Sequence, residues 1–479
     1  MSLAGRAIRS ATWAGSAASL VMAIGFVRSV LLARLLPIEV FGVYALAFAI
    51  VSLSGALAGF GLREALLYRS PETADEEPAA AVHFTLTVAA SLCWAGLLAA
   101  GAWIWAPGEL GTALVALALA HAGWRLTLTP RALLARRVAH RRLSVFAVVE
   151  AAAGAAVAVA LARAGFGLWA LLSVDIVRGV LALLAFYTWR PVWKPRLLWS
   201  SSRVRYFLRF GSRNVVGTLL DTALQRLDKL WLGLTLDRFA LGLYSRADRF
   251  ARIPGNLLGG PVVSVGGGAF AALGNDRERL SRAVFQVAAL VVRGSFLLAG
   301  ALILIAPEFV LLVLGERWLP IVPSMRILAA AFPLALMNRT LAQLFLARGR
   351  PATVVRVRAV QVAVLATGLA TLTPGLGREG AAVSVAAASL AGLVLSLRWA
   401  REHVELPYRR LFVAPALALA VSIAGTALGS ALWAPGAVDA TTAALKTAAA
   451  IGLYGLVLFG LERRELTRAL AYILRESSQ

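Results

Sequence analysis

Arginine side chains interrupt several stretches of the sequence that are otherwise apolar. A guanidinium group stays protonated and binds phosphate or carboxylate through two parallel hydrogen bonds. An ionisable group at membrane depth is costly, so it usually faces a partner or a water-filled cavity. The pattern therefore predicts a cationic cavity for an anionic ligand, unless the arginines form structural ion pairs or reach toward the membrane surface. The candidates are Arg28, Arg226, Arg246, Arg249, Arg252 and Arg293.

Carboxylates near these arginines follow helical spacing. Asp221, Gln225 and Asp228 are four and seven positions apart, which places them on one face of a helix. The two carboxylates could bind a coupling cation, or they could neutralise Arg226 and Lys229. We favour neutralisation.

Two further pairs are close enough in sequence to interact on a helix. Asp248 and Arg252 are four residues apart, the spacing of an intrahelical ion pair, so Asp248 is expected to orient the guanidinium of Arg252. Asp175 and Arg178 are three residues apart, and we expect them to form a second intrahelical pair with a structural role.

No pattern of residues typical of a catalytic site or a metal site stands out in the sequence. The single cysteine, Cys93, excludes a disulfide framework, and the four histidines show no ligand spacing. Neither a paired acid and base, nor a nucleophile triad, nor a phosphate-cradling glycine loop is present. We therefore expect a protein that is not an enzyme, with no metal site and no cofactor.

The elements that hold these side chains are membrane spans. Of the 479 residues, 60% are hydrophobic and only 15% are charged, whereas soluble proteins average about 25% charged residues. Since a helix needs about 20 apolar residues to cross a bilayer, the sequence predicts an all-α, polytopic membrane protein with fourteen transmembrane helices. The expected spans lie near 11–35, 42–67, 82–105, 110–133, 144–162, 168–189, 210–235, 240–268, 284–305, 321–346, 353–373, 379–399, 411–432 and 440–461. The seventh and eighth carry the most charge.

Basic residues between the spans predict the orientation. If both termini are cytoplasmic, 29 Lys and Arg residues fall in cytoplasmic segments and five fall in outer ones. This alternation follows the positive-inside rule. It also accounts for the formal net charge of +24 without nucleic acid, because the basic residues are spread over eight short segments that contact membrane lipids. The expected location is the inner membrane of a bacterium.

A weak internal repeat appears at an offset of 200 residues. Gly42 matches Gly242, Tyr44 matches Tyr244, and Leu57 matches Leu257. Six spans separate the copies, and an even number preserves orientation. This predicts parallel repeats related by an axis along the membrane normal. The expected organisation is two parallel six-helix lobes, 1–200 and 201–405, followed by two C-terminal helices and a cytoplasmic tail in 406–479.

The repeat and its surroundings resemble the polysaccharide or O-antigen flippases of the multidrug/oligosaccharidyl-lipid/polysaccharide exporter superfamily. The resemblance lies in Leu227-Asp228-Lys229, Gly242-Leu243-Tyr244-Ser245-Arg246-Ala247 and Ile253-Pro254, with counterparts Phe41-Gly42-Val43-Tyr44-Ala45-Leu46 and Gly59-Phe60-Gly61-Leu62. One departure is visible at Val265-Gly266-Gly267-Gly268-Ala269-Phe270, where such proteins often carry a proline followed by an aromatic residue.

The resemblance implies movement of a lipid-linked oligosaccharide, a polyprenyl-pyrophosphate glycan, across the inner membrane by alternating access. Such a transporter would serve surface polysaccharide synthesis and could act beside polysaccharide polymerase machinery. One alternative is a cation-coupled multidrug-type exporter of the same superfamily, although those proteins usually have twelve spans and a less charged interior. Another is a membrane glycan polymerase or ligase, which would be expected to carry a substantial outer loop for its chemistry.

Overall fold

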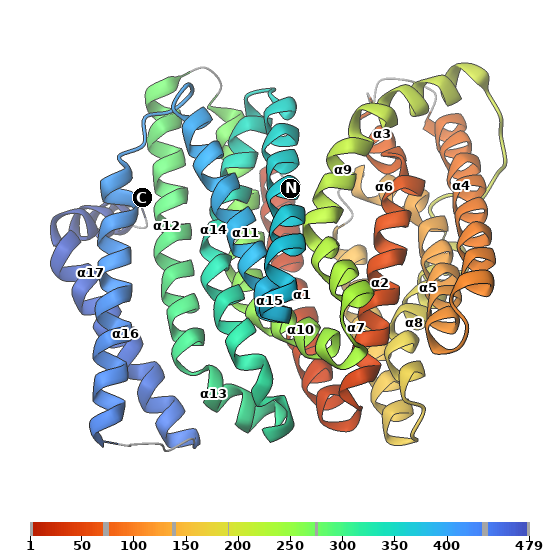
Figure 1. The fold of residues 1–479 in the computed structure, drawn as a ribbon. Helices are drawn as coiled ribbons and strands as arrows, with labels where there is room; N and C mark the ends of the chain where they lie inside the picture. The colour runs from red at the N-terminus through yellow and green to blue at the C-terminus, as the bar shows by residue number, and fades with distance from the viewer. Residues whose placement is uncertain are drawn as a thin grey trace. The chain divides into compact units, whose positions relative to one another are not determined.

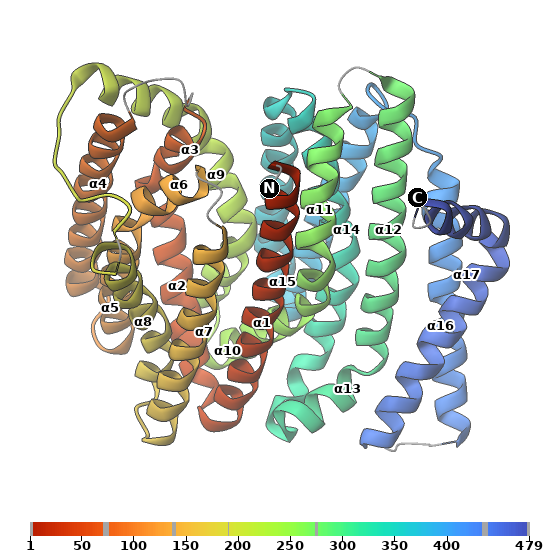
Figure 2. The ribbon, with the colours of Figure 1, turned by 180° about the vertical axis from the view of Figure 1, so that it is seen from behind.

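The computed structural model describes residues 3–69, 76–136, 140–189, 191–273, 276–433 and 439–476. Every regular element in these residues is helical, which confirms the all-α prediction (Figure 1 and Figure 2). The chain divides into two compact units, Met1–Ser245 and Arg246–Gln479. The boundary falls inside one helix, α10 (Arg238–Ala251).

The first unit is built around four helices whose apolar side chains interlock. Val43, Trp94, Leu117 and Leu172 come from α2, α4, α5 and α8 and are buried together. Around this core α1 packs along α7, α7 along α8, and α2 contacts both α5 and α9. The helices that precede α10 are α1 (Leu3–Leu35), α2 (Ile38–Gly59), α3 (Leu62–Leu67), α4 (Glu76–Trp105), α5 (Glu109–Leu126), α6 (Leu128–Arg136), α7 (His140–Arg163), α8 (Leu168–Tyr187) and α9 (Ser201–Thr235).

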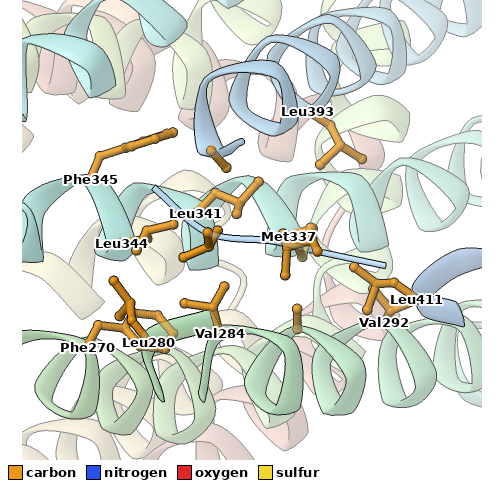
Figure 3. Packing of buried hydrophobic residues seen from close by; sticks show 14 of the residues in the cluster. Phe270, Leu280, Val284, Val292, Met337, Leu341, Leu344, Phe345, Leu393 and Leu411 are labelled. Carbon is orange, nitrogen blue, oxygen red and sulfur yellow. The ribbon is translucent and has the colours of Figure 1, made fainter. Parts of the chain in front are cut away.

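The second unit centres on α14 (Val322–Ala347), which packs against α11, α12 and α15. Met337, Leu341 and Leu344 of α14 meet Val284 of α12 and Leu393 of α15 in a continuous apolar cluster (Figure 3). The other helices are α11 (Ile253–Ala272), α12 (Arg277–Leu304), α13 (Ala306–Phe309), α15 (Pro351–Ala400), α16 (Ala414–Trp433) and α17 (Ala440–Glu476). Short π-helical turns at Val310–Leu314 and Arg409–Val413 and a 3₁₀ turn at Glu316–Ile321 connect them.

Among the described residues, ten helices are long and apolar enough to cross a membrane. This confirms a protein with many spans, while the exact count of fourteen stays a prediction. One of the ten, α15, is 50 residues long and is interrupted at Gly377, where φ is 55°. Residues expected in the second, fourth and eighth spans form two helices each, with breaks at Phe60 and Gly61, at Thr127 and at Arg252.

The repeat glycines bring α2 and the start of α10 into close contact. A β-carbon at Gly42 would overlap the carbonyl oxygen of Arg238, and one at Gly242 would overlap the carbonyl oxygen of Ile38. Ile38 and Arg238 are themselves separated by the repeat offset of 200. The contact is therefore reciprocal, and it requires glycine at both positions because only a hydrogen atom fits beside the neighbouring backbone.

Candidate functional site

A partly buried hydrogen bond between a tyrosine and an aspartate joins α2 to α8 in the first unit. The hydroxyl of Tyr44 on α2 donates to Oδ2 of Asp175 on α8 at 2.7 Å. Asp175 is 8% exposed. The half-buried guanidinium of Arg28 on α1 interacts electrostatically with both residues. Arg28, one of the arginines predicted to bind the ligand, is therefore near a carboxylate that already accepts a hydrogen bond from Tyr44.

Aromatic rings continue this cluster along α2. Tyr44 stacks on Phe48 with ring centroids 5.7 Å apart, and the ring of His121 on α5 meets the Phe48 ring edge-on at 5.6 Å. The guanidinium of Arg226 on α9 lies 4.7 Å from the Phe48 ring centroid, within the range of a cation–π contact. Arg28 and Arg226, two of the six candidate arginines, therefore both border the Tyr44–Phe48 face of α2.

The expected pair between Asp175 and Arg178 was wrong. Arg178 instead reaches Glu150 of α7 at 2.7 Å and lies over the ring of Trp124. Glu150 also receives Arg131 at 3.5 Å. Since the carboxylate of Glu150 lies on a neighbouring helix, it ties α7 to α8 and leaves Asp175 to Tyr44. Sequence spacing could not reveal this choice, because α7 and α8 meet only in the folded chain.

Asp228 forms the corresponding tyrosine contact at the second copy of the repeat. Tyr244 donates to Oδ2 of Asp228 at 2.8 Å, and Nζ of Lys229 lies 3.1 Å from the same oxygen. Asp228 is fully buried, so its charge is balanced at close range by Lys229. At the repeat offset Asp228 occupies the position of Arg28. The two copies thus place opposite charges beside equivalent tyrosines.

Asp221 lies on the same helix in a more accessible environment. Its Oδ2 is 3.5 Å from Nε2 of Gln225, and both side chains lie outside the buried core. The predicted polar face of α9 therefore runs from the accessible Asp221 to the buried Asp228. A role for either carboxylate in ion coupling stays a prediction.

A small, mostly apolar cavity in the second unit is lined in part by three charged side chains. Asp248 accepts from Nε of Arg252 at 2.6 Å, as their four-residue spacing predicts. Arg339 of α14 lines the same cavity, together with Phe332 and Ser389. The cavity volume is about 60 Å³, which is about the volume of two water molecules. Arg339 is exposed and Arg252 is 38% exposed, so both guanidinium groups can also be reached from outside the cavity.

Arg339 is the cavity residue that sequence reasoning did not select. It lies inside an apolar stretch like the other candidates, but no nearby acidic residue in the sequence marked it. Asn338 beside it binds α15, since its Nδ2 donates to the carbonyl of Ser389 at 2.8 Å and its Oδ1 accepts from Ser396 at 3.3 Å. Only the packing of α11 against α14 shows that Arg252, at the start of α11, shares a cavity with Arg339.

The remaining candidates occupy different surroundings. Arg246 is half-buried and Arg249 is exposed, both on α10. Arg293 of α12 makes a two-point contact with Glu462 of α17, Nε to Oε2 at 2.8 Å and Nη2 to Oε1 at 2.6 Å. This pair is largely buried, which favours a structural role for Arg293 in attaching α17 to α12.

Two bacterial proteins are similar to this chain in sequence. The chain is 28% identical over 333 residues to the succinoglycan biosynthesis transport protein ExoT of Rhizobium meliloti (strain 1021), covering 67% of this chain and 65% of that protein. It is 25% identical over 354 residues to the lipopolysaccharide biosynthesis protein WzxC of Escherichia coli (strain K12), covering 73% of this chain and 72% of the relative. The chain thus spans just under two thirds of the first relative's length.

Solved structures share the fold at low sequence identity. The lipid II flippase MurJ in an inward closed conformation superposes with a TM-score of 0.78 at 12% identity, covering 94% of this chain and 98% of that one. An inward-facing multidrug resistance transporter of the MATE family superposes with a TM-score of 0.58 at 14% identity, covering 81% and 94%. Residues 31–323, more than half of the chain, match the family model described as "Polysaccharide biosynthesis protein". The chain therefore belongs to the polysaccharide biosynthesis protein family of membrane proteins.

Proposed function

We propose that this protein is a flippase that moves a lipid-linked oligosaccharide, a polyprenyl-pyrophosphate glycan, across the inner membrane by alternating access. The observation that best supports this function is the cavity that Arg252 and Arg339 line together with Asp248. Guanidinium groups bind phosphate through two parallel hydrogen bonds, so they suit a diphosphate headgroup, which must leave water to cross the membrane. Membership of a polysaccharide biosynthesis family, with relatives named as transport and lipopolysaccharide biosynthesis proteins, supports the same class of substrate.

The proposed division of labour follows from the chemistry of the substrate. Arginines hold the diphosphate, the sugar chain occupies water-filled space, and the polyprenyl tail stays in the bilayer. Arg28, Arg226, Arg246, Arg249 and Arg252 are the proposed contacts, with Arg339 added by its place in the cavity. Asp248 positions Arg252 through their hydrogen bond. No bond is made or broken in the cargo, so this activity is transport and not catalysis.

The proposed architecture has fourteen spans in two parallel six-helix lobes, 1–200 and 201–405, with two added helices in 406–479. Both termini are cytoplasmic. The reciprocal contact of Gly42 and Gly242 supports a parallel repeat, since equivalent residues exchange equivalent neighbours. The break of α15 at Gly377 supports counting it as two spans. Interaction with a polysaccharide polymerase belongs to the same proposal.

The decisive experiment compares alanine and lysine at the cationic residues. Arg249→Ala and Arg252→Ala should abolish glycan export while the protein still inserts and accumulates, with lipid-linked intermediate retained on the cytoplasmic face. Lysine should restore export only partly, because it keeps the charge but loses the two-point contact. Full surface glycan from a stable double alanine variant would refute the cationic cavity.

A cation-coupled exporter of small molecules is the second candidate, favoured by the likeness of fold to the MATE transporter. That likeness concerns the fold alone. Drug susceptibility of a deletion strain separates the two candidates, because a flippase mutant loses surface glycan without a matching change in drug resistance.

A further inference from the structure

Residues 191–213 follow α8 in the chain. Their first ten residues, 191–200, have no regular secondary structure, and the rest form the first turns of α9. This segment runs alongside α4 (Figure 1 and Figure 2). Its course is fixed by two contacts: Trp193 is buried against Phe84, with ring centroids 5.4 Å apart, and the backbone N–H of Leu198 donates to Oγ1 of Thr85 at 2.9 Å. We call residues 191–213 the linking segment.

Large apolar side chains point away from the protein on either side of the Leu198 attachment. Leu197 is 72% exposed and Trp199 is 66% exposed. Irregular backbone with free N–H and C=O groups does not occur facing the hydrocarbon core of a bilayer. Tryptophan is enriched where a membrane meets water. A segment that exposes both irregular backbone and large apolar side chains beside a membrane span is therefore suited to the headgroup region.

Exposed basic side chains lie before and after these apolar residues along the linking segment. Lys194, Arg196, Arg205 and Arg209 are exposed, and none of them makes a hydrogen bond or ion pair within the part of the chain that the structure describes. No aspartate or glutamate occurs in the sequence between Asp175 and Asp221. The surface is thus a concentration of positive charge without an internal counter-charge.

The first turns of α9 present this charge in one direction. Val204 and Phe207 are buried against Leu62 and Leu66 of α3, which holds one face of the helix to the protein. Arg205 and Arg209, four residues apart, lie outside that face. These turns lie across the ends of the neighbouring helices before α9 changes direction (Figure 1). The arrangement resembles an interfacial helix with a basic outer side.

We propose that the linking segment is a binding surface for anionic phospholipid headgroups. Lys194, Arg196, Arg205 and Arg209 contact lipid phosphates, while Leu197 and Trp199 insert among the upper acyl carbons. Exposed apolar side chains beside a span favour a lipid surface over an acidic protein, which would leave Leu197 and Trp199 facing water. On the proposed topology this surface meets the cytoplasmic leaflet. The inference concerns lipid binding and stands apart from the transported cargo.

The test uses the full-length protein with Cys93→Ser and Leu197→Cys, labelled at residue 197 with an environment-sensitive NBD fluorophore. Vesicles of phosphatidylcholine alone are compared with vesicles that also contain phosphatidylglycerol. We expect phosphatidylglycerol to shift the emission to shorter wavelength and to increase quenching by spin-labelled lipids. Replacing Lys194, Arg196, Arg205 and Arg209 with glutamine should raise the phosphatidylglycerol content needed for half of the shift by at least about tenfold.

Two control proteins separate lipid binding from loss of structure. Arg196→Lys, Arg205→Lys and Arg209→Lys together keep the charge and should keep the response. Arg279→Gln with Arg282→Gln removes two exposed arginines that already pair with Asp276 and Glu278, so it should leave the response unchanged. Equal emission in both vesicle types would overturn the proposal. So would a shift that survives the glutamine substitutions, or capture of an acidic protein without any response to phosphatidylglycerol.

Discussion

Gly42 lies so close to Arg238 that a β-carbon at the glycine would overlap the carbonyl oxygen of the arginine. The same relation holds in reverse between Gly242 and Ile38. Two helices can approach this closely only when small residues face the neighbouring backbone. The close crossing therefore requires that residues 42 and 242, one in each copy of the repeat, carry only a hydrogen atom in place of a side chain.

Substituting either glycine should disrupt this crossing. Gly42→Ala and Gly242→Ala should each lower stability by about 1–3 kcal/mol, because backbone atoms cannot rotate away as a side chain can. The measurement is the thermal unfolding midpoint in detergent, followed by glycan export in cells. Gly96→Ala on α4 is the matched control, since a β-carbon there meets no atom within 4 Å. Equal effects at Gly42 and Gly96 would contradict the close crossing.

The pair of Tyr44 and Asp175 should behave as one unit. Tyr44→Phe removes a hydrogen bond to a charged acceptor and should cost about 1.5–3 kcal/mol. Asp175→Asn removes the negative charge that faces Arg28. If the residues act together, the double variant should be less destabilised than the sum of the two single variants. Additive losses in unfolding experiments would show that the contact contributes nothing to stability.

Arg293 and Glu462 offer a test of structure against substrate binding. Arg293→Ala should lower stability by about 3–5 kcal/mol, because it leaves the carboxylate of Glu462 buried without a partner. Replacing both residues with apolar ones, as Arg293→Met with Glu462→Leu, should recover much of that loss. Export measured in this double variant then decides the matter: normal export means that Arg293 is not a substrate contact.

Arg339 should be as important for export as Arg252, because the two guanidinium groups line one cavity. We expect Arg339→Ala to reduce export at least about tenfold at a normal protein level, and Arg339→Lys to recover part of it. Arg326→Ala is a suitable control on the same helix, since Arg326 does not line this cavity and its Nε donates to the carbonyl of Ile303. A normal export rate in Arg339→Ala would remove this residue from the proposed site.

The orientation can be checked with topology reporters. Fusions near Arg141, Arg203, Arg356 and the C-terminus should report the cytoplasm, while fusions near Gly108 and Asp237 should report the outside. The physical reason is the preference of basic residues for the cytoplasmic side. A consistent reversal beyond one loop would place an error in the number of spans at that loop.

The sequence was most informative where a local pattern determines the structure. Apolar runs predicted the helices, and the four-residue spacing of Asp248 and Arg252 predicted their contact. It was misleading at Asp175 and Arg178, where the same reasoning failed because Glu150 on α7 supplies a better-placed carboxylate. Spacing along one helix cannot show which neighbouring helix brings a competing partner.

Gly55 and Gly59 show a second limit of pattern reasoning. Their four-residue spacing is typical of two helices in close contact. In the structure the space beside them is filled by a side chain, since a β-carbon at either glycine would lie 3.4 Å from Nη2 of Arg125. Arg125 donates to the carbonyl of Gly55 and lies over the ring of Trp94. A long-range contact of this kind leaves no signature in the sequence.

The attachment of α17 to α12 has a consequence for how the protein is made. Arg293 precedes Glu462 by 169 residues. At about 5–20 residues per second, a ribosome needs about 8–34 seconds to synthesise that interval. Throughout this time α12 holds a guanidinium at membrane depth without its carboxylate, an arrangement that disfavours stable insertion by about 3 kcal/mol. The carboxylate that α12 needs is therefore supplied by α17, a helix synthesised much later. A chain shortened before residue 440 would leave Arg293 without this partner and open to degradation by membrane quality-control proteases.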